Sequence, residues 1–262
     1  MRYRVVDVFT DRPLAGNALC VVVDPCPEER MQAVAREANL SETTFVTHRG
    51  EGEYTLRIFT PTVELPFAGH PTLGTAWVMG PGRWFQTTSG GRVAVTVDGD
   101  GAEMVQPDPE IREVDEPQLR TALRLDRIVG SWRAEAAGTG HLIAAVDEPI
   151  DSLRPDPDAA GELLDRHATA TLAVVRRLEG STLHVRVLFR GVGIAEDPGT
   201  GSVAGPIGML ARRLWELGPD LLIRQGDEIG RPSRIRVHAE PGDLRVGGRV
   251  VLAAEGRFAL HR

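Results

Sequence analysis

The chain contains an internal repeat, which constrains its fold more than any other feature of the sequence. Residues 64–70 (ELPFAGH) and 196–202 (EDPGTGS) share Glu, Pro and Gly at identical spacing. A β-rich run ending in Phe precedes each segment and an apolar stretch of helical length follows it, at residues 54–59 and 73–79 in the first copy and 183–189 and 203–215 in the second. Because repeats of this length are units of structure, the sequence predicts two similar halves.

The correspondence extends in both directions from this segment. Residues 16–24 resemble residues 140–147. Residues 91–97 resemble residues 234–237, and a Gly-Asp turn follows both of these segments. Both halves then have the order strand, amphipathic helix, strands, loop, apolar helix, strands. Matching segments in the same order in both halves indicate a duplication.

The apolar helices indicate how each half is built. Residues 73–79 are apolar on nearly every side, so a helix there needs cover all round. Short alternating strands such as residues 92–97 can wrap such a helix. The predicted fold class is therefore α+β, with two pseudo-symmetric half-domains, each a curled mixed sheet or barrel around a central helix.

Proline and charged residues between positions 106 and 128 interrupt the pattern and suggest the boundary. We expect a first half-domain at residues 1–115, with its central helix at about 70–80. We expect a second at residues 116–262, with its central helix at about 202–217. The active site is expected in a cleft between them.

Composition excludes several chemistries. All 30 basic residues are arginine, so Schiff-base chemistry, a pyridoxal-phosphate lysine and a Walker A loop are excluded. No His, Cys or carboxylate cluster has the spacing of metal ligands along the sequence, so no metal site is predicted.

The charge and the N-terminal residues bear on partners and location. A net charge of −7 argues against nucleic acid, and no run of 18 apolar residues predicts a membrane span. The start, residues 1–6, has no signal-peptide character, and the only cysteines are Cys20 and Cys26. We expect a cytoplasmic protein with a small-molecule substrate.

Each repeat places a glycine and then a polar residue at the start of its apolar helix. These polar residues are His70 and Ser202. Free N–H groups at a helix start favour an anion, so two such starts facing one cleft would bind a small carboxylate. The plainer alternative is that both residues only cap their helices. Two carboxylates, Glu42 and Asp197, break the symmetry of the repeats, although a lone Glu is by default a solvated surface residue.

Seven segments together resemble the PhzF family of phenazine biosynthesis, and the resemblance covers essentially the whole chain. They are residues 6–10 with 16–17, 40–43 (LSET), 59–61, 64–71 (ELPFAGHP), 196–202, 225–226 with 230–233, and 246–248. Ala18, Gly199 and Val203 depart from the usual family pattern, which bears on substrate identity more than on chemistry.

The resemblance implies the diaminopimelate-epimerase fold and a cofactor-free isomerase, active as a homodimer in secondary metabolism. The isomerisation of a dihydro-hydroxyanthranilate, or a related step, is the implied reaction. The family's acid/base residue corresponds to Glu42, and its assisting residues correspond to His70, Asp197 and Ser202. The neighbouring residues expected to bind substrate are Ser41, Gly69, Pro71, Thr200 and Gly201.

Two alternatives remain at this point. A non-catalytic ligand-binding protein could keep the same fold, although all four expected polar residues are present. A racemase or epimerase of this fold would use one cysteine from each half, but those positions hold Ala68 and Thr200.

Overall fold

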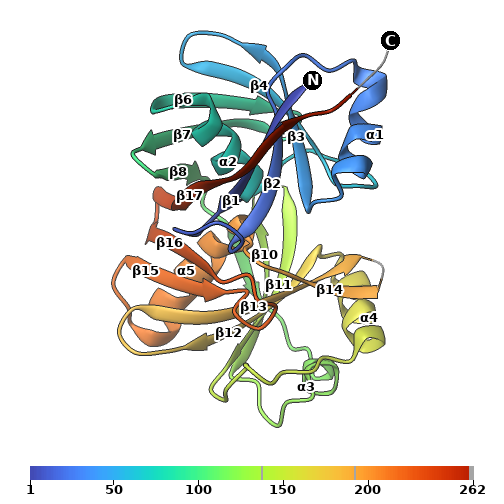
Figure 1. Ribbon diagram of the computed structural model, residues 1–262. Coiled ribbons are helices and arrows are strands. Elements are labelled where there is room, and N and C mark those ends of the chain that lie inside the picture. Colours follow the sequence, from blue (N-terminus) through green and yellow to red (C-terminus); the bar gives the residue numbers. More distant parts are fainter. Residues whose placement is uncertain (137, 192, 260–262) are drawn as a thin grey trace. The chain divides into compact units, whose positions relative to one another are not determined.

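The chain forms two compact units in a computed structural model, which describes residues 1–136, 138–191 and 193–259 (Figure 1). Unit 1 consists of Met1–Val105 and Gly247–Arg262, and unit 2 consists of Gln106–Val246. Each unit combines strands with a few helices, as an α+β fold does.

Unit 1 begins with two strands, and most of its elements follow in chain order. They are β1 (Arg2–Val8), β2 (Asn17–Val22), α1 (Glu28–Ala38), β3 (Glu42–Arg49), β4 (Glu53–Phe59), β5 (Glu64–Leu65), α2 (Gly69–Met79), β6 (Gly82–Thr88), β7 (Gly91–Asp98) and β8 (Gly101–Gln106). The last strand of the chain, β17 (Asp243–Arg257), completes the unit with its second part.

The strands of unit 1 close into a barrel. Pairing runs β1–β2–β3–β4–β6–β7–β8–β17, and β17 pairs back onto β1. The pairs β2–β3 and β4–β6 are parallel. Closure of the ring leaves none of these strands with a free edge.

Helix α2 packs inside this barrel, against β1, β2, β3, β6 and β7. Contact is so close at Gly74 that a Cβ there would lie 2.7 Å from Leu19 Cδ2 and 2.9 Å from Val8 Cγ2. Helix α1 instead flanks the barrel from outside, and its Met31 and Val34 pack with Phe45 (Figure 1). The apolar helix is therefore the central one, as its sequence predicts.

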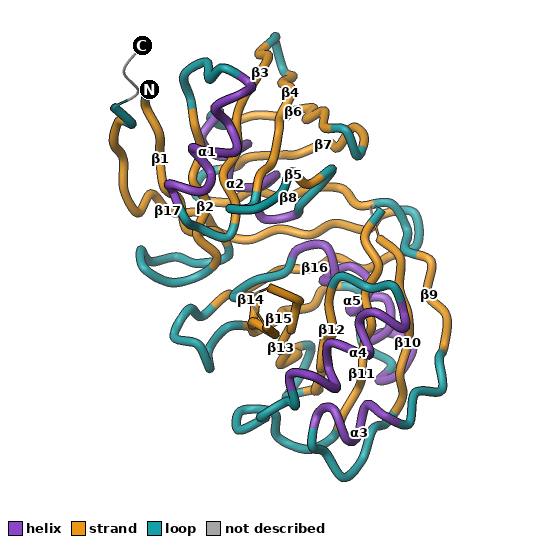
Figure 2. The backbone as a smooth tube through the Cα atoms, turned by 90° about the vertical axis from the view of Figure 1, so that its right-hand side faces the viewer, coloured by secondary structure: helices purple, strands orange, loops and turns teal. Residues whose placement is uncertain are grey.

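Unit 2 repeats this design with an extra strand and an extra short helix. Its elements are β9 (Glu110–Glu113), α3 (Gln118–Leu123), β10 (Gly130–Ala136), β11 (Thr139–Val146), α4 (Pro157–His167), β12 (Thr171–Arg177), β13 (Thr182–Gly191), β14 (Gly193–Asp197), α5 (Gly201–Trp215), β15 (Asp220–Gln225), β16 (Ser233–Glu240) and the first part of β17. Figure 2 shows helices α3 and α4 of this unit side by side.

The two units share one topology. From β10 to β17 the elements follow the same order as from β1 to β8, and the paired strands have the same sense. The pairs β11–β12 and β13–β15 are parallel, like β2–β3 and β4–β6. The pairs β10–β11, β12–β13, β13–β14 and β15–β16 are antiparallel, like β1–β2, β3–β4, β4–β5 and β6–β7. The matching sequence segments fall on equivalent elements, so the duplication is evident in the structure.

The central helix of unit 2 is α5. It packs against β10, β11 and β16, and a Cβ at Gly208 would lie 2.8 Å from Val237 Cγ1. The observed central helices, α2 and α5, overlap the expected ranges of about 70–80 and 202–217. None of the described helices is both long enough and apolar enough to cross a lipid bilayer.

The units do not follow the expected division at residues 115 and 116. The chain passes into unit 2 at Gln106, and residues from 247 onward belong to unit 1 rather than to the second half. The reason is strand pairing, because β17 continues out of unit 2 and its residues 250–257 pair with β1. A C-terminal segment that completes the first barrel cannot be inferred from local sequence.

Candidate active site

Glu42 and His70 lie together in unit 1. Glu42 is the first residue of β3, beside Leu19 of β2, and His70 is the second residue of α2. Strand β3 and helix α2 are in contact, so the start of the strand brings Glu42 to the N-terminal end of the helix. Both side chains are largely buried, with 15% of Glu42 and 6% of His70 exposed.

The two side chains approach closely but are not aligned as a hydrogen bond. His70 Nε2 lies 3.1 Å from Glu42 Oε2. Within the described part of the chain, neither atom has a hydrogen-bond partner. Because buried polar atoms in proteins are nearly always paired, two adjacent atoms of this kind mark a place suited to a polar ligand. Catalytic contacts often tighten only when substrate is bound.

Asn17 holds the imidazole of His70. It is the first residue of β2, and its side-chain amide donates to His70 Nδ1 over 3.2 Å. An imidazole that accepts at Nδ1 carries its proton, when neutral, on Nε2, which is the nitrogen that faces Glu42. The sequence signal for Asn17 was the Gly16-Asn17 pair within the family resemblance, which gave Asn17 no role. In the structure Gly16 has a φ of +62°.

The starts of helices α2 and α5 are not capped by His70 and Ser202. The N-cap positions belong to Ala68 and Thr200, and neither makes a side-chain capping bond. The interpretation of His70 and Ser202 as N-caps is therefore wrong, because each is the second residue of its helix. Neither helix has an acidic residue in its first turn, so the positive end of each dipole lacks a nearby charge from that turn.

Asp197 lies in unit 2, at the end of β14 and just before α5. The hydroxyl of Thr200 donates to Asp197 Oδ2 over 2.5 Å. Gln225, at the end of β15, binds this loop three times: its Nε2 donates to the Asp197 carbonyl (2.7 Å) and to Thr200 Oγ1 (3.0 Å), and its Oε1 accepts from the Thr200 N–H (3.2 Å). The buried Gln225 therefore fixes the geometry of the Asp197 loop.

Gly226 allows this attachment. Its φ is +76°, and a Cβ at this position would lie 2.4 Å from the Arg231 carbonyl and 2.6 Å from the Pro198 carbonyl. Only glycine permits that approach of two backbone segments. The Gln225-Gly226 pair belonged to the family resemblance, but sequence alone did not assign it to the Asp197 loop.

The glutamate shared by the two repeats forms an equivalent ion pair in each unit. The strand register pairs Phe59 with Glu64 in unit 1 and Leu188 with Glu196 in unit 2. In each unit an arginine two residues before the Phe or Leu lies on the same face of the sheet as the glutamate. Arg57 contacts Glu64 through two nitrogens at 2.8 Å, and Arg186 contacts Glu196 at 2.9 and 2.6 Å. The common Glu is therefore engaged in a structural ion pair in each unit, whereas Asp197, which follows it in unit 2, accepts a hydrogen bond from the hydroxyl of Thr200.

The other expected site residues fall on the same two helix starts. Glycines Gly69 and Gly201 are the first residues of α2 and α5, and Pro71 is buried in the first turn of α2. Ser202 is half-buried in α5, and Ser41 is exposed just before β3. Glu42 and His70 are brought together, as are Asp197 and Thr200. The expected convergence of all four acid/base residues stays a prediction.

The position of Glu42 has no carboxylate in unit 2. Thr171, the first residue of β12, stands there, and its hydroxyl pairs with Nδ1 of the buried His141 at 2.8 Å. Desolvation, with a smaller contribution from the charge of Arg133, lowers the pKa of His141 to about 3. The histidine is therefore neutral at any ordinary pH.

This buried histidine should make the fold sensitive to acid. Its pKa is lowered in the folded state, so between about pH 6.5 and 3 the unfolded chain binds a proton that the folded chain does not. The contribution of His141 to the free energy of unfolding is thus fully present above the pKa of about 6.5 that this residue has in the unfolded chain, and it is lost as pH falls below that value. Between pH 7 and 5 the loss should be about 2 kcal/mol.

Urea unfolding at the two pH values measures this effect. The matched variant is His141→Leu, because register places Leu19 at the equivalent position of unit 1. That variant should lose about 2 kcal/mol less than the wild type over the same pH interval. Equal losses of stability in the wild type and the variant would show that His141 is not the cause of the acid sensitivity.

The cysteines do not fit an acid/base role. Cys20 is buried on β2, where desolvation raises its pKa to about 12. Desolvation and Glu29 likewise raise the pKa of Cys26. Thiolates are scarce under these conditions, and the two helix starts carry Ala68 and Thr200 instead. A two-cysteine racemase is not supported.

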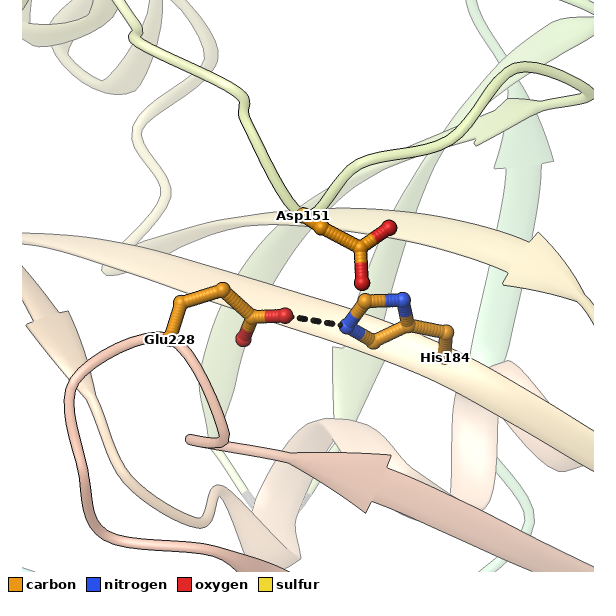
Figure 3. Close-up of side chains that lie close together, drawn as sticks. All are labelled: Asp151, His184 and Glu228. Atoms are coloured by element: carbon orange, nitrogen blue, oxygen red, sulfur yellow. Dashed lines mark hydrogen bonds and ion pairs between the residues drawn. The ribbon is translucent and has the colours of Figure 1, made fainter.

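One further polar cluster lies in unit 2. Asp151, His184 and Glu228 each offer a ligand atom, and these atoms lie within 4.8 Å of one another (Figure 3). The three residues are far apart in the sequence, which is why linear spacing predicted no metal site.

Comparison with known proteins identifies the family. The model of the PhzC-PhzF family, described as phenazine biosynthesis-like protein, matches residues 6–256. A trans-2,3-dihydro-3-hydroxyanthranilate isomerase from Pseudomonas aeruginosa is 36% identical, over 99% of each chain.

Solved structures agree with this match. A predicted epimerase from Pseudomonas aeruginosa has a TM-score of 0.86 at 30% identity, over 99% of each chain. A PhzF-family phenazine biosynthesis protein from Bacillus anthracis has a TM-score of 0.87 at 20% identity, also over 99% of each chain, which shows the shared fold. The predicted α+β fold of the diaminopimelate-epimerase type is thereby confirmed. The chain belongs to the PhzC-PhzF family of phenazine biosynthesis-like proteins and, like its curated relatives, is an isomerase.

Proposed function

We propose that the chain is a cofactor-independent isomerase that moves a proton between carbon atoms of a small carboxylate-bearing metabolite of the dihydro-hydroxyanthranilate type. The observation that carries the proposal is the buried pair of Glu42 and His70 at the start of α2, with one oxygen and one nitrogen 3.1 Å apart and no hydrogen-bond partner for either among the described residues. A curated relative named for this isomerisation supports the substrate class.

Glu42 is the proposed acid/base residue. A carboxylate can take a proton from a carbon next to a conjugated system and return it to another carbon while the double bond shifts. Atoms and electrons are conserved in such a step, so the isomerisation itself needs no oxidant or reductant. The Glu42 side chain is 15% exposed, so a proton that it holds can exchange with water while the residue stays within reach of a bound ligand.

His70 is the proposed hydrogen-bond donor of the site. Asn17 occupies Nδ1, so Nε2–H is directed to the region of Glu42, where it can stabilise charge that develops on a substrate oxygen. This role depends on the tautomer that Asn17 selects.

The substrate carboxylate is proposed to bind at the start of α2. The first N–H groups of an α-helix have no partner within the helix, and the helix dipole favours an anion there. The first turn of α2 contains Gly69, His70 and Pro71 and no acidic residue that would repel such a group.

Asp197 and Ser202 belong to the proposal as assisting residues from unit 2. The hydrogen bonds of Gln225 support this role because they hold the Asp197 loop in one geometry. Substrate binding by Ser41, Gly69, Pro71, Thr200 and Gly201 remains part of the same proposal. The homodimer, the cytoplasmic setting and a place in secondary metabolism stay predictions of the sequence.

The test is deuterium incorporation during turnover in D₂O. Purified protein is incubated with trans-2,3-dihydro-3-hydroxyanthranilate, and the product is analysed by mass spectrometry and NMR. We expect isomerisation with deuterium appearing at the carbon that receives the proton, because a proton taken up by the partly exposed Glu42 can exchange with solvent before it is returned. If the compound binds but neither isomerises nor exchanges a C–H hydrogen, the enzymatic proposal fails for this substrate class and a binding protein is favoured.

A further inference from the structure

We infer that Asp151, His184 and Glu228 form a binding site for one divalent transition-metal ion, of the Zn²⁺ type, within unit 2. The inference does not depend on the proposed isomerisation. Figure 3 shows the three side chains converging from three separate segments: the loop after β11, strand β13, and the turn between β15 and β16.

Geometry is the first argument. One ligand atom from each residue lies within 4.8 Å of the others, and His184 Nε2 is 2.7 Å from Glu228 Oε1. Ligands of one metal ion stand at about 2.0–2.2 Å from it, so atoms this close together can share an ion after small side-chain rotations. An imidazole with two carboxylates suits Zn²⁺ or a neighbouring transition metal better than Mg²⁺, which prefers oxygen.

The second argument is a buried oxygen of Glu228. The Glu228 side chain is only 10% exposed, and its Oε2 is buried without a hydrogen-bond partner among the described residues. A buried carboxylate oxygen in this state is costly, and a bound cation would compensate it. The His184 contact uses the other oxygen, and the orphaned atom points away from the imidazole in Figure 3, so a rotation of the carboxyl group would bring it to an ion.

Charge favours a cation at this place. Asp151 and Glu228 contribute two negative charges around a histidine that binds metal in its neutral form. The nearby guanidinium of Arg186 is opposed by Glu196, with which it forms a buried two-point pair. The local sum of these groups is therefore negative, and a divalent ion would neutralise it.

The surroundings hold the ligands in place. Arg186 Nη1 donates to the carbonyls of Ile150 and Leu153, both at 2.9 Å, and so fixes the loop that carries Asp151. Glu228 follows the Gln225-Gly226 pair that holds the Asp197 loop. An ion at this site would thus link the loop that carries Asp151 to the turn between β15 and β16, which carries Glu228 and follows Gln225. Its role would be structural.

The experiment is calorimetric titration of the metal-free full-length protein with Zn²⁺, together with thermal unfolding. We expect one ion per chain at micromolar or tighter affinity, and a rise in unfolding midpoint of about 5 °C or more at a hundredfold excess over the dissociation constant. Substitution with Co²⁺ should give a visible absorption spectrum of the bound ion.

Three variants identify the site. His184→Gln and Glu228→Gln should each weaken Zn²⁺ binding at least tenfold and abolish the Co²⁺ spectrum. Asp151→Asn changes an exposed residue and should weaken binding without affecting the fold, so it tests the site even if a buried variant is unstable.

The matched control is His238→Gln. His238 is also close to carboxylates, but Asp220 lies on its Nδ1 side (2.7 Å) while Glu240 and Asp243 lie on its Nε2 side, so one ion cannot join all of them. This variant should bind Zn²⁺ like the wild type. Absence of binding by the wild type, or binding that Asp151→Asn and His184→Gln leave unchanged, overturns the inference.

Discussion

Replacing Glu42 with glutamine is expected to lower turnover by about 10²–10⁴-fold while the protein remains folded. The amide is nearly isosteric with the carboxyl group but cannot take a proton from carbon and return it. Glu42 is the first residue of β3 and its side chain has no hydrogen-bond partner at Oε2 among the described residues, so the stability change should stay within about 1 kcal/mol.

Substrate binding should change much less than turnover. The substrate carboxylate is proposed to bind the backbone at the start of α2, which the substitution leaves intact. Initial rates, deuterium incorporation and calorimetric binding, measured on the same preparation, separate the two effects. Asp197→Asn is the comparison variant, with a smaller loss expected if Asp197 only assists. Wild-type rates from Glu42→Gln would remove Glu42 from the mechanism.

Replacing Arg186 with methionine is expected to destabilise the protein by about 3–5 kcal/mol. Only 6% of the Arg186 side chain and 9% of its partner Glu196 are exposed. Although desolvation opposes its charge, the hydrogen bonds and charge of Glu196 raise the pKa of Arg186, so the guanidinium is charged. Its loss leaves a carboxylate buried without its cation and also frees the carbonyls of Ile150 and Leu153.

The repeat supplies the control for this prediction. Arg57→Met removes the equivalent arginine of unit 1, where 29% of Arg57 and 37% of Glu64 are exposed. Water can solvate the remaining Glu64, so this change should cost about 0–1 kcal/mol. Urea unfolding of the two variants measures the difference. Equal losses would mean that the burial of the pair in unit 2 does not determine its contribution.

Much of the fold could be predicted because the repeat and the apolar helices are local features of the sequence. The stretch at residues 73–79, apolar on nearly every side, required a helix with cover all round, and α2 lies inside a barrel. The return of β17 to β1 could not be predicted in this way. It depends on pairing between the two ends of the chain, and no pattern within β17 indicates its partner.

The candidate site was predictable in part. Glu42 and His70 came from the family resemblance, and the structure brings them to 3.1 Å. The roles of Asn17 and Gln225 could not be predicted because each acts through a hydrogen bond to a residue distant in sequence. The cluster that includes His184 was missed for the same reason.

The path of β17 also determines the order in which the protein can be completed during synthesis. Unit 2 ends at Val246, so its residues leave the ribosome before the strand that closes the barrel of unit 1. Until then β1 and β8 are open edges, and β1 carries the apolar Val5, Val6 and Val8. At ~5–20 residues per second, unit 1 waits roughly 7–30 s in this unclosed state. The nascent first barrel therefore presents two open strand edges to other chains until the last strand of the protein has been synthesised.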